Sequence, residues 1–296
     1  MLKTLKEGRI LVGDGAWGTF IYQKGLKAGE CPESWNLSRP EDVQDVAAKY
    51  IAAGADMVET NSFGGSRFKL EAYGLAEQTF EINQAAAHLS KKAAGNKWVL
   101  GSVGPTGKML LMGDVNETEL YEAFKEQAKA LEAGGADLIC VETMSALDEA
   151  EIAVKAAREN TGCAIICTFT FSKTLQNTYR TMMGVSPQEA ATTAIKAGAD
   201  IIGSNCGNGA EGMLEIVKEF RQHFPEIPLM VQANAGMPTN IDGKDVFPET
   251  PEHMAAFINP LIEAGVNIIG GCCGTTPAHI SQIKQVVNQY NESLKV

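Results

Sequence analysis

One phrase recurs along the chain and limits the folds that it can adopt. Its four copies are AAGADMVET at residues 52–60, AGGADLICVET at 133–143, KAGADIIGSNC at 196–206 and EAGVNIIGGCC at 263–273. In each copy a helix-like stretch ends in glycine, which suits the left-handed position after a helix. An Asp or Asn and an apolar run follow. The run is too uniformly apolar for a half-exposed strand, so it predicts a strand buried on both faces.

Four similar apolar runs lie between these copies, at residues 9–16, 97–105, 163–171 and 228–236. Amphipathic stretches fill the gaps, and the one at 186–198 opens with a Ser-Pro-x-Glu cap signal. Eight β-then-α units predict an α/β fold of the closed (β/α)8 TIM barrel type. An open doubly wound sheet is the alternative, but it would seldom alternate so evenly. Since no linker or charge block divides the chain, residues 1–296 are predicted to form a single domain.

Composition excludes some classes of function. The formal charge of −11 argues against nucleic-acid binding, which needs a basic footprint. No run approaches the roughly 20 apolar residues of a membrane helix, and no signal peptide is recognisable. We therefore expect a cytoplasmic protein with reduced thiols. Of its seven cysteines, Cys140, Cys163 and Cys167 lie in apolar runs and are predicted core fillers, whereas Cys31 lies in a polar loop with no predicted role.

The carboxyl ends of the strands form the face of such a barrel that carries the chemistry. Three sulfurs fall on this rim: Cys206 ends the sixth predicted strand, and the adjacent pair Cys272 and Cys273 ends the eighth. Only one strand separates the two ends, so the three thiolates can face one point. The alternative is that the pair merely fills the barrel mouth and Cys206 is unrelated.

Three thiolates suit a zinc ion. Structural zinc sites take four protein ligands, but the rim offers no fourth Cys and no His, since the histidines fall in helical stretches: His88, His223, His253 and His279. One coordination position is thus left open, as in catalytic zinc sites. Zinc with three thiolates activates water poorly, but it can hold an incoming thiol as the thiolate. The pattern predicts chemistry at sulfur.

Rim carboxylates suggest that the thiol is an amino acid. Asp14 and Glu142 have no basic neighbour in sequence and can pair with an ammonium group, and Glu59 is a third candidate. The alternative is that these carboxylates cap the helices that follow. The bends GAWGT, with Gly15, and GSVGPTG, with Ser102, offer backbone N–H groups suited to a carboxylate.

The motifs DGAWGT, ETNSFGGSRFKLEAYG, GSVGPTG, ETM, NCG and GGCCGT follow in this order across nearly the whole chain. Together they resemble the homocysteine S-methyltransferase family, most of all the homocysteine-binding barrel of cobalamin-dependent methionine synthases. The resemblance implies that Cys206, Cys272 and Cys273 bind zinc and that Asp14 and Glu142 hold the amino group of homocysteine. It places Asn234 near the metal, in the open position without substrate. Gly15, Thr60 and Ser102 complete the predicted substrate-binding set.

The resemblance implies methyl transfer to homocysteine, giving methionine. It favours a methylcorrinoid donor, which would arrive on a separate protein docking over the barrel mouth. The long segment at residues 168–187, which contains Arg180 and a Met-Met pair, is either part of that docking surface or a lid, or else a plain connecting loop. Alternatives are S-methylmethionine or betaine as donor, another small thiol as acceptor, or a non-catalytic accessory subunit.

Overall fold

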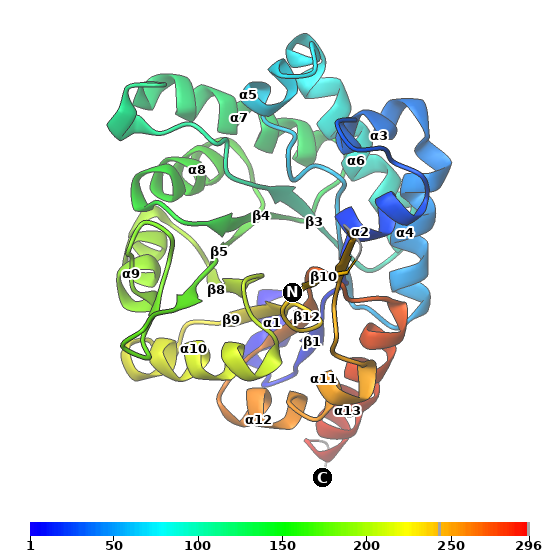
Figure 1. The fold of residues 1–296 in the computed structure, drawn as a ribbon, viewed down its shortest axis with the longest axis vertical. Coiled ribbons are helices and arrows are strands. Elements are labelled where there is room, and N and C mark those ends of the chain that lie inside the picture. The colour runs from blue at the N-terminus through cyan, green and yellow to red at the C-terminus, as the bar shows by residue number, and fades with distance from the viewer. Residues whose placement is uncertain (242–243, 295–296) are drawn as a thin grey trace.

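The computed structural model describes residues 1–241 and 244–294. Eight parallel strands form one sheet in the order β1-β12-β9-β8-β5-β4-β3-β2, and helices surround it in a ring (Figure 1). The strands are β1 (Leu11–Val12), β2 (Met57–Glu59), β3 (Trp98–Val103), β4 (Leu138–Met144), β5 (Ala164–Phe169), β8 (Ile201–Asn205), β9 (Leu229–Ala233) and β12 (Ile268–Gly271). The predicted barrel is thereby confirmed in a nearly closed form, and each predicted strand is present.

The recurring phrase has a structural reason. Its Asp or Asn lies just before a strand, and its side chain accepts a hydrogen bond from the backbone N–H of the neighbouring strand: Asp56 from Val12, Asp137 from Val99, Asp200 from Ile165 and Asn267 from Leu229, at 2.8–3.0 Å. The preceding glycines have φ of 99–109°. These turns fix the register between paired strands at the amino end of the barrel.

Asp56 also closes the seam of the barrel. β1 and β2 stand at opposite ends of the strand order, but the backbone N–H of Asp56 donates to Val12 O at 2.7 Å. Its carboxylate pairs with Lys284 at 2.7 Å and with Lys97 at 3.2 Å. One buried residue, through its backbone and its side chain, thus replaces a strand ladder between β1 and β2.

The outer helices begin and end much as the sequence predicts. α9 starts at a reciprocal Ser186–Glu189 capping box, which confirms its predicted cap. The helices are α1 (Leu2–Lys6), α2 (Gly18–Gln23), α3 (Trp35–Ser38), α4 (Pro40–Ala52), α5 (Arg67–Glu71), α6 (Thr79–Ala94), α7 (Glu117–Ala133), α8 (Leu147–Asn160), α9 (Pro187–Ala197), α10 (Ala210–His223), α11 (Pro251–Ala255), α12 (Ile258–Glu263) and α13 (Pro277–Ser293). No helix among the described residues is long and apolar enough to cross a bilayer.

Two apolar clusters hold the fold together. The larger packs the helices against the strands and includes Cys163 and Cys167. The smaller fills the amino end of the barrel lumen, where Cys140 lies and Leu5 of α1 closes the bottom. The prediction of core cysteines is confirmed for these three. Cys31 is buried as well, against Leu70 and Ile82.

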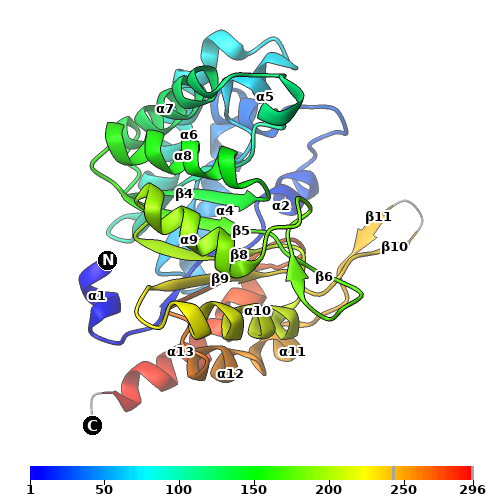
Figure 2. The ribbon, with the colours of Figure 1, turned by 90° about the vertical axis from the view of Figure 1, so that its left-hand side faces the viewer.

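Two short hairpins project from the carboxyl ends of strands and were not predicted. β6 (Ser172–Lys173) pairs with β7 (Tyr179–Arg180) after β5, inside the segment at 168–187. β10 (Thr239–Ile241) pairs with β11 (Lys244–Val246) after β9. Figure 2 shows both hairpins on the side of the barrel opposite α1. They therefore border the face on which the predicted site lies.

Candidate active site

The three predicted metal ligands converge at the mouth of the barrel. The Sγ atoms of Cys206, Cys272 and Cys273 all lie within 4.8 Å of one another, and those of Cys206 and Cys273 are 3.8 Å apart. Zinc–sulfur bonds of about 2.3 Å in a tetrahedron place two sulfurs about 3.8 Å apart. The donor set and its spacing therefore fit a zinc ion with three protein ligands.

Local backbone geometry turns these thiols to one point. Cys206 follows β8 with φ of 59°, and its N–H donates to Gln232 O at 3.0 Å. After β12, the N–H of Cys272 donates to Ala233 O at 2.7 Å, and Cys273 O accepts from the N–H of Ala235 at 3.0 Å. The adjacent cysteines thus lie beyond the strand, where side chains no longer alternate between two faces.

The thiols behave electrostatically as one group. Hydrogen bonds from Cys272 and Cys273 lower the pKa of Cys206 to about 3. The pKa of Cys273 is raised to about 11, chiefly by its hydrogen bond with Cys206. One thiolate among two thiols is already stabilised without a cation, and a divalent cation would favour ionisation of the other two.

Three carboxyl groups occupy the same end of the barrel lumen. Asp14, Glu59 and Glu142 are buried, and none of them pairs with a Lys or Arg among the described residues. Burial raises the pKa of all three, and the pKa of Glu59 reaches about 7. An ionised carboxyl group that is buried without a counter-charge destabilises the folded protein. The arrangement therefore suits a cationic ligand.

Neutral donors hold these carboxyl groups in place. Asp14 accepts hydrogen bonds from Trp17 Nε1 at 2.8 Å and from the N–H of Glu59 at 2.9 Å. Glu59 accepts from Gln232 Nε2 at 2.7 Å, and Glu142 accepts from the Ser102 hydroxyl. Among the described residues, none of the three carboxylates accepts a cap hydrogen bond from the helix that follows it, so the capping alternative is not supported.

A cavity of about 390 Å³ connects the thiols with the carboxyl groups. Most of the predicted site residues line it: Gly15, Glu59, Thr60, Ser102, Glu142, Cys206, Cys272 and Cys273. Asp14 lies behind this wall. Asn234 is also buried behind it, where its side chain hydrogen-bonds the Cys206 thiolate and its Oδ1 has no partner among the described residues. The structure thus places Asn234 beside the thiols, and its predicted place in the open position of the metal stays a prediction.

Sequence analysis missed other residues of the cavity wall. Gln232 reaches Glu59, and Trp17, Phe63 and Glu33 also line the cavity. Gln232 lies on β9 two residues before Asn234 and so faces the same side of the strand. That period of two was the available signal. No comparable signal marks the loop residues.

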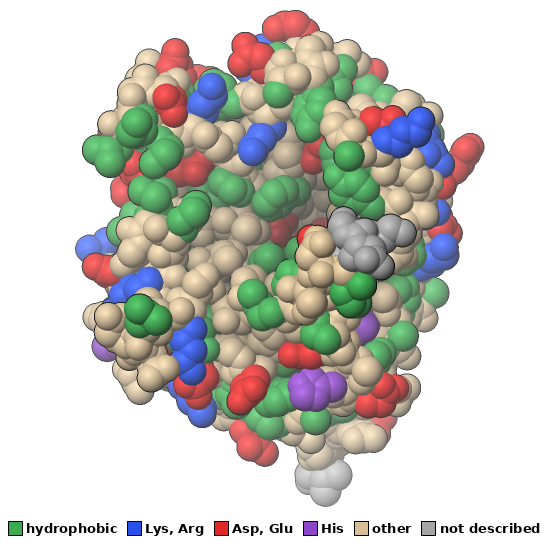
Figure 3. Space-filling view, in the orientation of Figure 1, with side chains coloured by type: hydrophobic (Ala, Val, Ile, Leu, Met, Phe, Trp, Pro, Cys, Tyr) green, Lys and Arg blue, Asp and Glu red, His purple; other side chains and the backbone are tan. Residues whose placement is uncertain are grey.

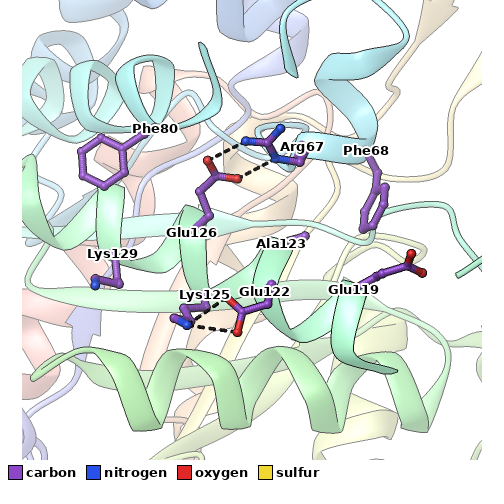
Figure 4. Close-up of a pocket in the computed structure, with 9 residues that line it drawn as sticks. All are labelled: Arg67, Phe68, Phe80, Glu119, Glu122, Ala123, Lys125, Glu126 and Lys129. Carbon is purple, nitrogen blue, oxygen red and sulfur yellow. Dashed lines mark hydrogen bonds and ion pairs between the residues drawn. The ribbon is translucent and has the colours of Figure 1, made fainter. Parts of the chain in front are cut away.

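A second hollow, of about 550 Å³, lies on the outer surface beside α7 and holds no thiol (Figure 4). Across it Arg67 of α5 pairs with Glu126 of α7 through Nε and Nη2, at 3.0 and 3.1 Å. Lys125 and Glu122 pair along α7. The Arg67–Glu126 pair ties α5 to α7, and α5 follows the segment at residues 60–63, which lines the barrel cavity.

Comparison with known proteins agrees with this geometry. A family model described as homocysteine S-methyltransferase matches residues 11–287. The chain belongs to the homocysteine S-methyltransferase family. The resemblance in sequence is thereby confirmed, and the chain is an enzyme of this family with a three-cysteine group suited to zinc. Homocysteine as the substrate is implied by the family.

Individual relatives are similar over most of the chain. It is 33% identical to a methionine synthase of Mycobacterium tuberculosis over 294 residues and 32% identical to that of Mycobacterium leprae over 307. It spans about a quarter of the length of these relatives. In fold it matches a structure of the Escherichia coli homocysteine methyltransferase MmuM described as the metallated form, with a TM-score of 0.79, 24% identity and coverage of 96% and 98% of the two chains.

Proposed function

We propose that this protein transfers a methyl group to the thiol of homocysteine and so forms methionine. One observation carries the proposal: three convergent thiols and the buried carboxyl groups of Glu59 and Glu142 line one cavity, with Asp14 behind them, and no Lys or Arg among the described residues pairs with these groups. A ligand with a thiol at one end and an ammonium group at the other satisfies both. Homocysteine is such a ligand.

Cys206, Cys272 and Cys273 would hold the zinc ion. When bound, zinc supplies a fourth position at which the substrate thiol is held as its thiolate, whereas a free thiol of pKa near 8.5 is only a few per cent ionised at pH 7. A new S–CH3 bond forms as the donor–CH3 bond breaks, and the leaving group keeps the electron pair of that bond. No protein base is required once the thiol has lost its proton.

The chain's own residues bind and orient the amino acid. Glu142 and Glu59 line the cavity and would accept hydrogen bonds from the ammonium group. Asp14, held by Trp17, lies directly behind them and adds negative charge. The burial of these groups strengthens each interaction, because it excludes water from the site.

As the donor we propose a methylcorrinoid carried by a separate protein. The resemblance of the sequence motifs to cobalamin-dependent methionine synthases supports this, and so does the surface around the mouth. Large apolar side chains are exposed on the loops after β3, β5 and β9: Met109, Leu111, Met112, Leu175, Met182, Met183, Met237, Ile241 and Val246. Apolar side chains lie around the hollow of this face (Figure 3). Exposed apolar patches are typical of protein interaction sites, and Met-rich ones adapt to their partner.

A cationic donor such as S-methylmethionine or betaine is the second candidate. The cavity lining also combines the aromatic rings of Trp17 and Phe63 with the buried carboxyl group of Glu33. Aromatic faces with a carboxylate attract sulfonium and quaternary ammonium groups. Methionine formation from homocysteine with methylcobalamin, but not with either cationic compound, would support the corrinoid. The reverse result would favour the cationic donor.

X-ray absorption at the zinc edge tests the acceptor. We expect three sulfurs and one lighter atom in the resting protein, and four sulfurs after homocysteine is added. A count that stays at three would keep the zinc site but exclude homocysteine as the thiol that reaches it. A resting count below three would contradict the proposed ligand set itself.

A further inference from the structure

Two residues beside the cavity have a left-handed backbone although neither is glycine. Thr143 has φ of 60° and Cys206 has φ of 59°. A side chain disfavours this conformation, most of all a β-branched one such as threonine, so it persists only where surrounding contacts impose it. Each residue borders a functional group of the proposed site, since Thr143 follows Glu142 and Cys206 is itself a proposed zinc ligand.

The conformation of Thr143 determines where Glu142 points. The register between β4 and β5 shifts between Val141 and Met144, which is an irregularity of the β-bulge type. Such bulges redirect a side chain and leave a backbone group without its ladder partner. Here the unpaired N–H of Thr143 donates instead to Asn205 Oδ1 at 2.9 Å.

The side chain of Asn205 uses every hydrogen bond that an amide offers. Its Oδ1 also accepts from the Thr168 hydroxyl at 2.7 Å. Its Nδ2 donates to Thr143 Oγ1 at 2.7 Å and, more weakly, to Glu142 Oε2 at 3.4 Å. The residue is fully buried and immediately precedes Cys206. Because the N–H of Thr143 can only donate, the amide has one possible orientation.

The backbone of Asn205 is held as firmly as its side chain. Its carbonyl accepts from the Thr170 hydroxyl at 2.8 Å, and β8 pairs it with Gln232 of β9. The next N–H, that of Cys206, donates to Gln232 O at 3.0 Å. A movement of the Asn205 amide would therefore be transmitted both to the bulge at Glu142 and to the backbone that directs the Cys206 thiol.

From these contacts we propose that Asn205 is a positioning residue that couples the ammonium-binding end of the site to the metal-binding end. It holds Thr143 in the bulge that directs Glu142 into the cavity, and it fixes the turn that directs Cys206 toward Cys272 and Cys273. The inference rests on the proposed acceptor, because the role of Glu142 is to bind the amino group. Asn205 itself touches neither the substrate nor the methyl group.

The test compares Asn205→Ala and Asn205→Asp with the wild-type protein. Asn205→Asp keeps the shape of the side chain but loses both donated hydrogen bonds, so it serves if the alanine variant fails to fold. Asn291→Ala is the matched control. Asn291 is also buried and hydrogen-bonds Ile10 N and O at 3.0 and 2.9 Å, at the amino end of β1 far from the thiols. It should lower the melting temperature without affecting the site.

The first readout is the rate at which a chelating dye removes zinc from the loaded protein. The second uses cobalt(II) in place of zinc, where the sulfur-to-metal charge-transfer band reports thiol binding. Titration with homocysteine and with 4-mercaptobutanoate, which lacks the amino group, gives the ratio of the two Kd values. No methyl donor is required for either measurement.

We expect both Asn205 variants to release zinc at least about tenfold faster and to lose at least about tenfold of the preference for homocysteine, since each loses buried hydrogen bonds. The coupling is overturned if only one readout changes, or if neither does and the variants merely melt earlier like Asn291→Ala. Equal binding of both thiols by the wild type would refute the proposed acceptor, and with it the coupling. Faster zinc release would then still show that Asn205 supports Cys206.

Discussion

Replacement of Glu142 by Gln separates the proposed acceptor from any other small thiol. Glutamine has the same shape and retains an oxygen that can accept from the Ser102 hydroxyl, but it carries no charge. A hydrogen bond to a charged group contributes about 1.5–3 kcal/mol, which corresponds to about a 10- to 150-fold change in an equilibrium or rate ratio. The carboxylate of Glu59 remains in the cavity wall, so some preference for an ammonium group should survive.

The assay measures kcat/KM for homocysteine and for 4-mercaptobutanoate at a saturating concentration of the same methyl donor. For Glu142→Gln we expect the value for homocysteine to fall within that 10- to 150-fold range. The value for 4-mercaptobutanoate should stay the same or rise, because one negative charge leaves a crowded acidic group. An equal loss for both thiols would refute the assignment of Glu142 to the amino group.

Glu149→Gln is the matched control for this measurement. Its carboxyl group is also buried, accepts hydrogen bonds from the N–H and the hydroxyl of Thr106 at 2.8 and 2.6 Å, and lies in α8 outside the cavity wall. Burial raises the pKa of Glu149 as it does that of Glu142. The control should leave the ratio of the two kcat/KM values within about twofold, since it removes no group that faces the acceptor.

Three further predictions concern the metal, pH and the partner surface. Cys206→Ser should lose zinc by elemental analysis, whereas Cys167→Ser, in the core, should retain zinc and only unfold at a lower temperature. Because burial raises the pKa of Glu59 to about 7, the folded state holds this proton more tightly than the unfolded chain. The stability of the ligand-free protein should therefore fall as pH rises from about 5 to 8, and Glu59→Gln should flatten that fall in thermal melts. Leu175→Glu with Met182→Glu should slow methyl transfer from a carrier-bound methylcorrinoid but not from free methylcobalamin; equal rates with the carrier would argue against docking on this surface.

The sequence was sufficient to predict the barrel because its repeated phrase has a single structural role. Each Gly-x-Asp or Gly-x-Asn turn pairs the start of one strand with its neighbour, so the spacing of the phrase is the spacing of the strands. The three-cysteine group was predictable for a related reason. The carboxyl ends of parallel strands lie on one face of a barrel, so cysteines at the ends of two nearby strands can be predicted to lie close together.

Other parts of the site depend on geometry that local sequence does not encode. Thr143 and Cys206 adopt left-handed backbones through contacts with residues on other strands, and their residue types predict the opposite. The hairpins β6–β7 and β10–β11 are too short for a period-two pattern to emerge. Asp14 lies behind the cavity wall, where it accepts a local hydrogen bond from Trp17 and a second one from the N–H of Glu59, which is 45 residues away in sequence.

Every second residue along a strand points into the barrel lumen, so each strand carries one series of side chains that runs from the core to the site. Inward-facing positions begin as apolar residues of the lumen cluster and become small or polar toward the mouth: Met57 then Glu59, Leu100 then Ser102, Leu138 then Cys140 and Glu142, Ile201 then Gly203 and Asn205, Met230 then Gln232, and Ile268 then Gly270. The lumen therefore has an apolar floor that is packed independently of any ligand and a polar layer above it.

The glycines of the intermediate layer make room for this change. A Cβ atom on Gly203 would lie 1.9 Å from Met230 O, and one on Gly270 would lie 3.2 Å from Cγ of Gln232. A side chain at either position would displace β9 or the glutamine that hydrogen-bonds Glu59. The apolar floor then provides the stability that the acidic layer lacks at neutral pH, where burial of the carboxyl groups opposes their ionisation. A cationic amino group that enters the layer supplies the missing counter-charge, so the carboxyl groups can ionise without loss of stability. Substrate binding should therefore raise the stability of the fold most strongly on the alkaline side of pH 7, where the ligand-free protein is least stable.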